Sequence, residues 1–222
     1  MLAVLSAGIA PGLALLCFFY LKDQYETEPL RMVLKMFIYG AFLTLPIMFI
    51  QYVFSTEGFF HTSFLQAFFS SGMIEEFFKW LILFRSIYQH AEFDEPYDGI
   101  VYATSVSLGF ATVENILYLI ANGVEFAFTR ALLPVSSHAL FGVMMGYYLG
   151  KSKFSRRGKK RTALFLSLFL PFVFHGLYDY ILILKETWMY AIIPFMLFLW
   201  WQGLKKVKDA RIVTLHDKKK IQ

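Results

Sequence analysis

Charged residues and cysteine are scarce in this sequence. Only 17% of its 222 residues are Asp, Glu, Lys or Arg, whereas 58% are hydrophobic. A water-soluble domain needs a more polar surface, so this composition excludes an ordinary soluble fold. The single cysteine, Cys17, excludes an internal disulfide and a thiolate metal cluster.

Familiar hydrolase signatures are missing as well. No H-E-x-x-H motif occurs, which argues against a zincin-type metalloprotease. No G-x-S-x-G motif occurs, which argues against an α/β serine hydrolase. There is also no internal repeat, low-complexity tract or long linker. We therefore predict a single integral-membrane domain over residues 1–222.

What the sequence does contain is a series of long apolar segments. Each is long enough to cross a ~30 Å hydrocarbon core as a helix. No positive charge precedes the first segment, so we expect it to be retained rather than cleaved as a signal peptide. The pattern predicts an all-α, polytopic transmembrane helical bundle of about seven spans. The predicted spans are residues 2–21, 32–54, 63–88, 98–121, 124–150, 163–185 and 188–206.

Basic residues gather in two polar segments that follow predicted spans. The loop 151–161 carries seven Lys and Arg residues, and the tail after residue 204 carries seven more. By the positive-inside rule both face the cytoplasm, which places the N-terminus outside and the C-terminus inside. Basic clusters beside spans are better explained as anchors at membrane lipids than as nucleic-acid sites. We expect membrane lipids, and no nucleic acid, among the partners.

Ionisable side chains deep within apolar segments are the main functional signal. Each costs roughly 2.5–3.5 kcal/mol on membrane insertion scales, so such groups need partners and usually have a function. The third segment holds Glu75, Glu76 and Lys79 on one helical face, together with Ser71 and Gly72. This polar face is expected to contact other helices.

The next three segments carry further polar groups at compatible depths. Glu114 and Asn115 lie in the fourth segment and His138 in the fifth. His175 and Asp179 lie in the sixth, four residues apart and therefore on one helical face. Under the predicted topology all of these groups fall in the middle or outer half of the membrane, so we expect them to meet at one level.

Such a constellation suits hydrolysis. A carboxylate kept from bulk water can take a proton from a bound water molecule, and a neighbouring histidine can pass that proton to the leaving amine. An Asn, His or Lys side chain can stabilise the developing oxyanion. Because two adjacent glutamates repel in a low dielectric, one is expected to be protonated or paired with Lys79.

Several of these residues also have a purely structural explanation. Glu75 and Lys79 can form an i,i+4 pair that only fixes helix packing. His138 can be a packing histidine, and Asp179 can serve only to orient His175. Separately, the four-residue spacing of glycines at 142, 146 and 150 is typical of a close-packed helix interface.

Two other functions use the same residues. His138, His175 and the carboxylates can hold a metal ion, as in a metal-dependent intramembrane protease. A proton-coupled transporter or sensor would use a relay formed by Glu75, Glu114, His175 and Asp179. The lack of an internal repeat and of paired broken helices argues against a transporter.

Four motifs follow one another in the chain, each on its own predicted helix. They are Glu75-Glu76-x-x-Lys79, Phe110-x-x-x-Glu114-Asn115, His138-Ala-Leu-Phe-Gly142 and His175-Gly-x-x-Asp179. Together they resemble the PrsW family of bacterial intramembrane proteases, over essentially the whole chain. That family is similar to the CAAX prenyl endopeptidases, which have a double glutamate, then F-x-x-x-H and H-x-x-x-N. Glu114 and Asp179 depart from that wider pattern, and we infer that His138 takes the place of the missing histidine.

The resemblance implies a glutamic-type intramembrane endopeptidase of the bacterial cell membrane that needs no cofactor or metal. It implies site-1 cleavage of a single-pass membrane anti-sigma factor, which starts the release of a stress-response sigma factor. By position, Glu75 is the water-activating base, Glu76 is its partner, and His175 assists proton transfer or the oxyanion. The supporting residues, in a proton relay or at the oxyanion, are expected to be Lys79, Glu114, Asn115, His138 and Asp179.

Overall fold

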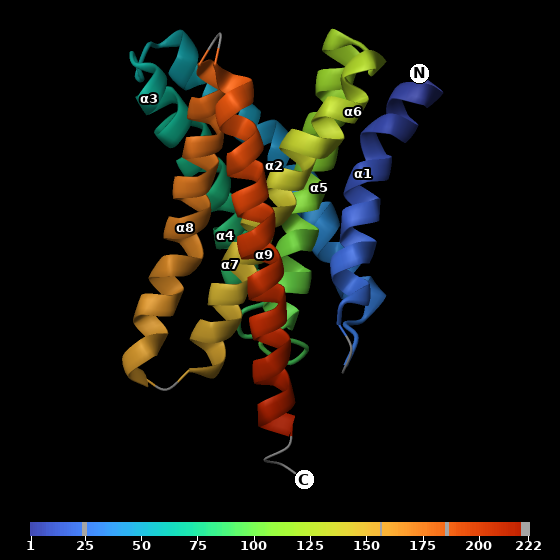
Figure 1. The fold of residues 1–222 in the computed structure, drawn as a ribbon, viewed down its shortest axis with the longest axis vertical. Coiled ribbons are helices and arrows are strands. Elements are labelled where there is room, and N and C mark those ends of the chain that lie inside the picture. The colour runs from blue at the N-terminus through green and yellow to red at the C-terminus, as the bar shows by residue number, and fades with distance from the viewer. Residues whose placement is uncertain (24–25, 156, 185–186, 219–222) are drawn as a thin grey trace.

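The computed structural model describes residues 1–23, 26–155, 157–184 and 187–218, and this part of the chain is all-α, as predicted. Long helices run up and down along one axis, and the start of the first helix and the end of the last helix lie at opposite ends of the bundle (Figure 1). The number of membrane crossings and their orientation remain predictions. Three of the basic residues used to predict the orientation, Arg156, Lys219 and Lys220, lie outside the described residues.

Most of the predicted spans correspond to one long helix each. The helices are α1 (Leu2–Leu21), α2 (Leu30–Thr56), α3 (Ser63–Leu65), α4 (Ile74–Ser86), α5 (Asp98–Asn122), α6 (Ala127–Arg130), α7 (Ser136–Phe154), α8 (Arg157–Ile183) and α9 (Trp188–Lys218). Shorter pieces join some of them, namely the π-helical segments η1 (Gln66–Met73) and η3 (Ala131–Val135) and the 3-10 turn η2 (Val124–Phe126).

Five helical segments of the described chain are long and apolar enough to cross a membrane. They are Leu2–Leu21, Leu30–Thr56, Asp98–Asn122, Val124–Phe154 and Gly158–Ile183. The third and last predicted spans are not among these five segments. The third carries the ionisable residues Glu75, Glu76 and Lys79 of α4.

The sequence pattern does not predict two stretches of π-helix. They lie directly before α4, which carries Glu75, and α7, which carries His138. In η1 the chain widens just before Glu75, and α3, η1 and α4 together replace the single helix predicted over 63–88. In η3, Pro134 lies four residues before His138 and cannot donate a backbone hydrogen bond. Insertions of this kind rotate the following residues around the helix axis and are frequent at functional sites.

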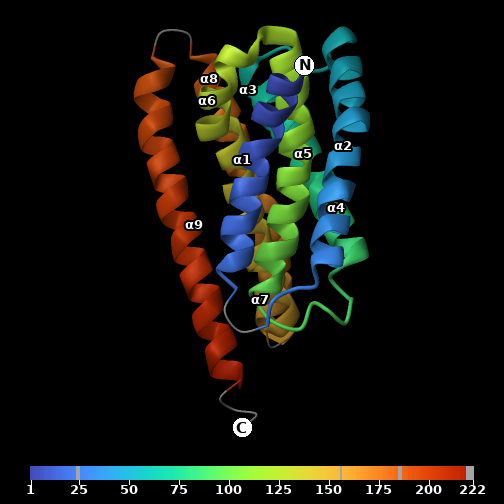
Figure 2. The ribbon, with the colours of Figure 1, turned by 90° about the vertical axis from the view of Figure 1, so that its right-hand side faces the viewer.

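Helix α5 forms the centre of the bundle and is buried without interruption from Asp98 to Thr112. Helices α1 and α2 lie on either side of it (Figure 2), and α7 packs against it as well. The predicted glycine stripe forms the α5–α7 contact, since a Cβ atom on Gly146 would overlap the backbone of Gly99. This close approach brings α7, and with it His138, up against α5.

Candidate active site

Ionisable groups from three helices meet inside the bundle. Glu75 and Glu76 come from α4, His138 from α7 and His175 from α8. All four side chains are buried, and one nitrogen or oxygen atom from each lies within 4.8 Å of the corresponding atoms of the others. The tertiary structure therefore brings together groups that are up to 100 positions apart in the sequence.

Lys79 lies at the centre of this cluster and is completely buried. Its Nζ atom is 3.2 Å from Oε2 of Glu75 and 2.9 Å from Oε1 of Glu76. The same atom lies 3.2 Å from Nδ1 of His138 and 4.0 Å from the ring centre of Phe110. One ammonium group thus compensates both adjacent carboxylates, and without it their mutual repulsion would be severe in this environment.

His175 is held between carboxylates on both sides of its ring. Nδ1 is 2.9 Å from Oε1 of Glu76, and Nε2 is 3.4 Å from Oδ2 of Asp179 and 3.9 Å from Oε2 of Glu75. Phe141 stacks on the imidazole at a centroid distance of 5.0 Å and an angle of 21°. The ring is fixed in orientation, and each nitrogen faces an acidic group, so the imidazole can accept and pass on a proton.

The two glutamates differ in accessibility. Glu76 is fully enclosed, whereas Glu75 keeps 6% of its surface exposed. Oε1 of Glu75 accepts a hydrogen bond from Nε2 of Gln51 at 3.0 Å, and Oγ of Ser71 lies 3.5 Å away. Gln51 was not predicted as a site residue, because a glutamine near the end of an apolar segment needs no buried partner.

Glu114 borders the cluster on the side of His138. Its Oε2 atom lies 3.1 Å from Nε2 of His138, and its Oε1 atom lies 3.5 Å from a guanidinium nitrogen of Arg130. Arg130 also donates through Nε to Oδ1 of Asn115 at 2.9 Å, and Asn115 donates to the carbonyl of Gly8 at 3.1 Å. Asn115 therefore links Arg130 to α1, and Arg130 in turn links it to Glu114.

Arg130 is the second residue that sequence reasoning missed. It is buried at 9% exposure and lies over the ring of Tyr118 at 4.1 Å. The available signal was an arginine inside a predicted span, which is as costly as an intramembrane glutamate. Its position near the start of that span made it resemble an ordinary interfacial residue.

The four donor groups are of a kind that binds zinc, which takes His nitrogen and carboxylate oxygen ligands. The Lys79 ammonium, however, already lies among them and contacts three of the four side chains. A metal ion would compete for the same oxygens and would leave the ammonium buried without its partners. Oε2 of Glu76 is a fully buried oxygen that has no hydrogen-bond partner among the described residues. As arranged, the residues do not fit a metal ion.

A membrane bundle with two carboxylates, two imidazoles and an ammonium buried between its helices is the arrangement expected of an intramembrane hydrolase. The comparisons with known proteins agree with this class. The sequence model of the PrsW family, described as an intramembrane metalloprotease, matches residues 28–201. No solved structure matches the chain significantly.

Close relatives cover nearly the full length. The chain is 60% identical over 215 residues to Protease PrsW of Bacillus subtilis, a match covering 97% of this chain and 99% of the relative. It is 59% identical over 211 residues to Protease PrsW of Geobacillus kaustophilus, covering 95% and 93%. Protease PrsW of Clostridioides difficile is 32% identical over 197 residues, covering 84% and 82%. The chain belongs to the PrsW family and is a multi-pass intramembrane protease of a bacterial membrane.

Proposed function

We propose that the chain is a glutamic-type endopeptidase in which Glu75 is the base that activates water. The observation that supports this most is the environment of the Glu75 carboxylate. Gln51 and Lys79 hold its two oxygens at 3.0 and 3.2 Å, and it is the more accessible glutamate of the pair. A carboxylate with a fixed orientation and a small open face is suited to take a proton from an attacking water molecule.

The other groups have complementary parts in this proposal. As the water oxygen bonds to the peptide carbonyl carbon, its proton moves to Glu75. His175, oriented by Glu76 and Asp179, delivers a proton to the amine nitrogen as the C–N bond breaks. The Lys79 ammonium, which contacts His138 beside the glutamate pair, stabilises through its positive charge the negative charge that develops on the carbonyl oxygen.

The proposed substrate is a single-pass membrane anti-sigma factor, cut at site 1 so that a stress-response sigma factor is subsequently released. This substrate follows from the resemblance of the four motifs to the PrsW family, whereas the names of the relatives state only that they are proteases. The predicted orientation puts the cut on the extracytoplasmic side, opposite the basic loop. A buried site among helices suits a substrate that is itself a membrane segment.

A metal-dependent protease is the second candidate, because the family description names a metalloprotease and because four suitable donors converge. The two candidates differ in the role of Lys79. In the glutamic mechanism the ammonium belongs in the centre of the site, whereas in a metal mechanism it has to move aside.

The test is cleavage of a tagged single-pass anti-sigma factor by purified protein in detergent. Glu75→Gln keeps the size of the side chain and removes the base, and Glu57→Gln makes the same change at an exposed position at the end of α2. We expect a defined fragment from the wild type and from the Glu57 variant, and none from an equally folded Glu75 variant.

Cleavage by the Glu75 variant at the wild-type rate would overturn the glutamate mechanism. A parallel reaction with a chelator separates the second candidate, since loss of activity that zinc restores would establish a metal-dependent protease. Flux of protons across liposomes without any peptide product would instead favour the transporter.

A further inference from the structure

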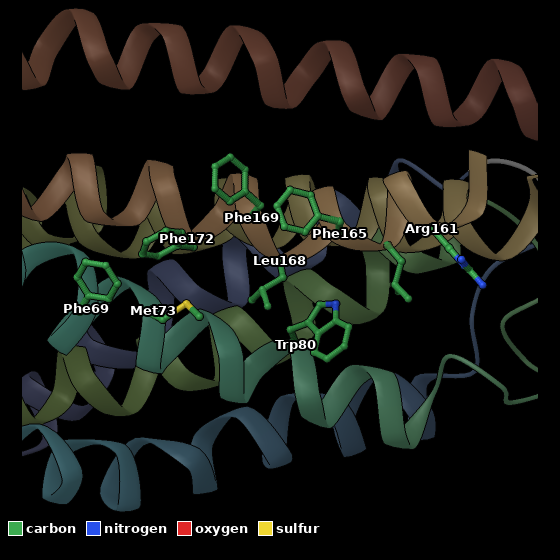
Figure 3. A pocket seen from close by; sticks show the side chains of 9 residues that line it. Phe69, Met73, Trp80, Arg161, Phe165, Leu168, Phe169 and Phe172 are labelled. Carbon is green, nitrogen blue, oxygen red and sulfur yellow. The ribbon is translucent and has the colours of Figure 1, made fainter. Parts of the chain in front are cut away.

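An apolar groove of about 470 Å³ runs between α4, with the preceding η1, and α8 (Figure 3). Eight of its nine lining side chains are apolar, and the ninth is Arg161. Phe165 and Phe169 on α8 remain 62% and 41% exposed, so the groove lies on the outer surface of the bundle. In a membrane this surface faces lipid.

The wall of the groove offers no free hydrogen-bonding group along its length. Its one neutral polar atom, Nε1 of Trp80, donates to Oγ of Ser167 at 2.9 Å. That hydroxyl in turn donates to the carbonyl of Leu164 at 2.7 Å. An occupant of the groove is therefore expected to be hydrocarbon wherever it touches this wall.

Charge is confined to one end. Figure 3 shows Arg161 at one end of the groove, and Phe69 and Phe172 at the other. Arg161 and Phe172 are eleven residues apart on α8, which corresponds to about 16 Å along a helix. This length matches half of a ~30 Å hydrocarbon core, so the groove spans the depth of one leaflet. Within the described residues, the guanidinium of Arg161 forms no ion pair.

The charge at one end favours one of two hydrocarbon occupants. A transmembrane helix would present only apolar side chains to the groove and leave the Arg161 guanidinium without a partner, whereas a phospholipid supplies both an acyl chain for the apolar wall and a phosphate for Arg161. The planar guanidinium at its end is suited to bind a phosphate through two parallel hydrogen bonds.

We propose that this groove binds an anionic phospholipid from the leaflet that borders the 151–161 loop, with one acyl chain along α8 and the phosphate at Arg161. The exposed Lys159 and Lys160 add positive charge next to Arg161 and favour an anionic over a zwitterionic head group. The deep end of the groove lies against Met73 and Phe172. These residues are two and three positions before Glu75 and His175, so a bound chain packs against both site-bearing helices.

The experiment measures retention of phosphatidylglycerol, compared with phosphatidylcholine of the same acyl chains, by native mass spectrometry of the full chain released from detergent. Arg161→Gln removes the phosphate ligand, and Lys159→Gln removes an equal charge two residues away, outside the groove. Leu168→Trp fills the groove without changing charge. We expect the Arg161 variant to bind phosphatidylglycerol well over 5-fold more weakly, the Leu168 variant to lose it, and the Lys159 variant, which loses surface charge but no phosphate ligand, to weaken by about 5-fold or less.

Several results would overturn the proposal. Equal losses in the Arg161 and Lys159 variants would mean diffuse surface attraction, and full retention by the Leu168 variant would place the acyl chain elsewhere. Equal protection against thermal unfolding by inorganic phosphate would mean an anion site without a lipid chain. If the Leu168 variant keeps its lipid but loses proteolysis, the groove instead receives the substrate helix. These readouts are independent of the glutamate mechanism, because lipid retention does not require cleavage.

Discussion

Nδ1 of His175 lies 2.9 Å from Oε1 of Glu76, although 99 positions separate the two residues in the chain. This contact ties α8 to α4 at the level of the glutamate pair. In the proposed mechanism it gives the fully buried Glu76 a function distinct from that of Glu75: Glu76 orients the histidine, and Glu75 is left to face the substrate.

Replacing Asp179 tests whether the second carboxylate at His175 matters for proton transfer. Asp179→Asn keeps the shape of the side chain and removes the negative charge 3.4 Å from Nε2. Because an imidazolium then loses stabilisation, we expect the cleavage rate to fall by about 10²–10⁴-fold with little change in thermal stability. Initial rates on a tagged substrate measure this, and a loss of stability equal to the loss of activity would show a purely structural role.

Removing the central ammonium should destabilise the fold strongly. Lys79→Met leaves the buried carboxylates of Glu75 and Glu76 without their shared partner, at an expected cost of about 3–5 kcal/mol. Adding Glu76→Gln to this variant removes one uncompensated charge, so the double variant should recover part of the loss. Reversible unfolding in mixed micelles measures both effects. If the double variant loses as much stability as the Lys79 and Glu76 single variants lose together, the Lys79–Glu76 ion pair has no net coupling energy.

Arg130 should act through geometry as well as charge. Arg130→Lys keeps a positive charge near Glu114. It loses the planar guanidinium group, which contacts Glu114 and also donates a hydrogen bond to Asn115. We expect lower stability and weaker cleavage, since both Glu114 and Asn115 lose a fixed partner. Thermal unfolding and initial rates report this. A lysine variant indistinguishable from the wild type would show that charge alone suffices.

The contact between α5 and α7 predicts a sharp difference between two glycines. Gly146→Ala places a methyl group against the backbone of Gly99, whereas Gly158→Ala meets nothing within 4 Å. We expect the Gly146 variant to lose about 1–3 kcal/mol by overpacking and the Gly158 variant to unfold like the wild type. Equal midpoints of thermal unfolding would contradict the close packing of these helices.

Glu28, in the connector before α2, should make stability depend on pH. Burial raises the pKa of Glu28 to about 7, and nearby Asp23 and Asp94 add to this effect. Its ordinary value is about 4.3, so between these values the folded chain holds a proton that the unfolded chain has released. Stability due to Glu28 is therefore present at low pH and is lost as the pH rises towards 7 and above.

We expect Glu28→Gln to flatten the fall in stability between pH 5 and pH 8 and to raise stability at pH 8. Unfolding midpoints at the two pH values measure this, with Glu57→Gln as the exposed control. An unchanged slope in the Glu28 variant would assign the pH dependence to other groups.

The sequence by itself determined the class of the protein and most of the candidate site. Apolar segments of spanning length predict an all-α membrane bundle, because the backbone has to satisfy its hydrogen bonds internally in lipid. Ionisable residues within such segments are costly, and this cost alone marks Glu75, Glu76, His138 and His175. The glycine spacing likewise predicts a close helix contact, since small residues leave room for it.

Only the tertiary structure decided which of these groups touch. That Lys79 lies between both glutamates and His138, and that Gln51 and Arg130 complete the site, depends on how each helix is rotated and how closely it approaches its neighbours. Two π-helical segments shift that rotation just before Glu75 and His138, and no local apolar pattern encodes them. Periodicity specifies the face on which a side chain lies, whereas packing between distant segments selects its partner.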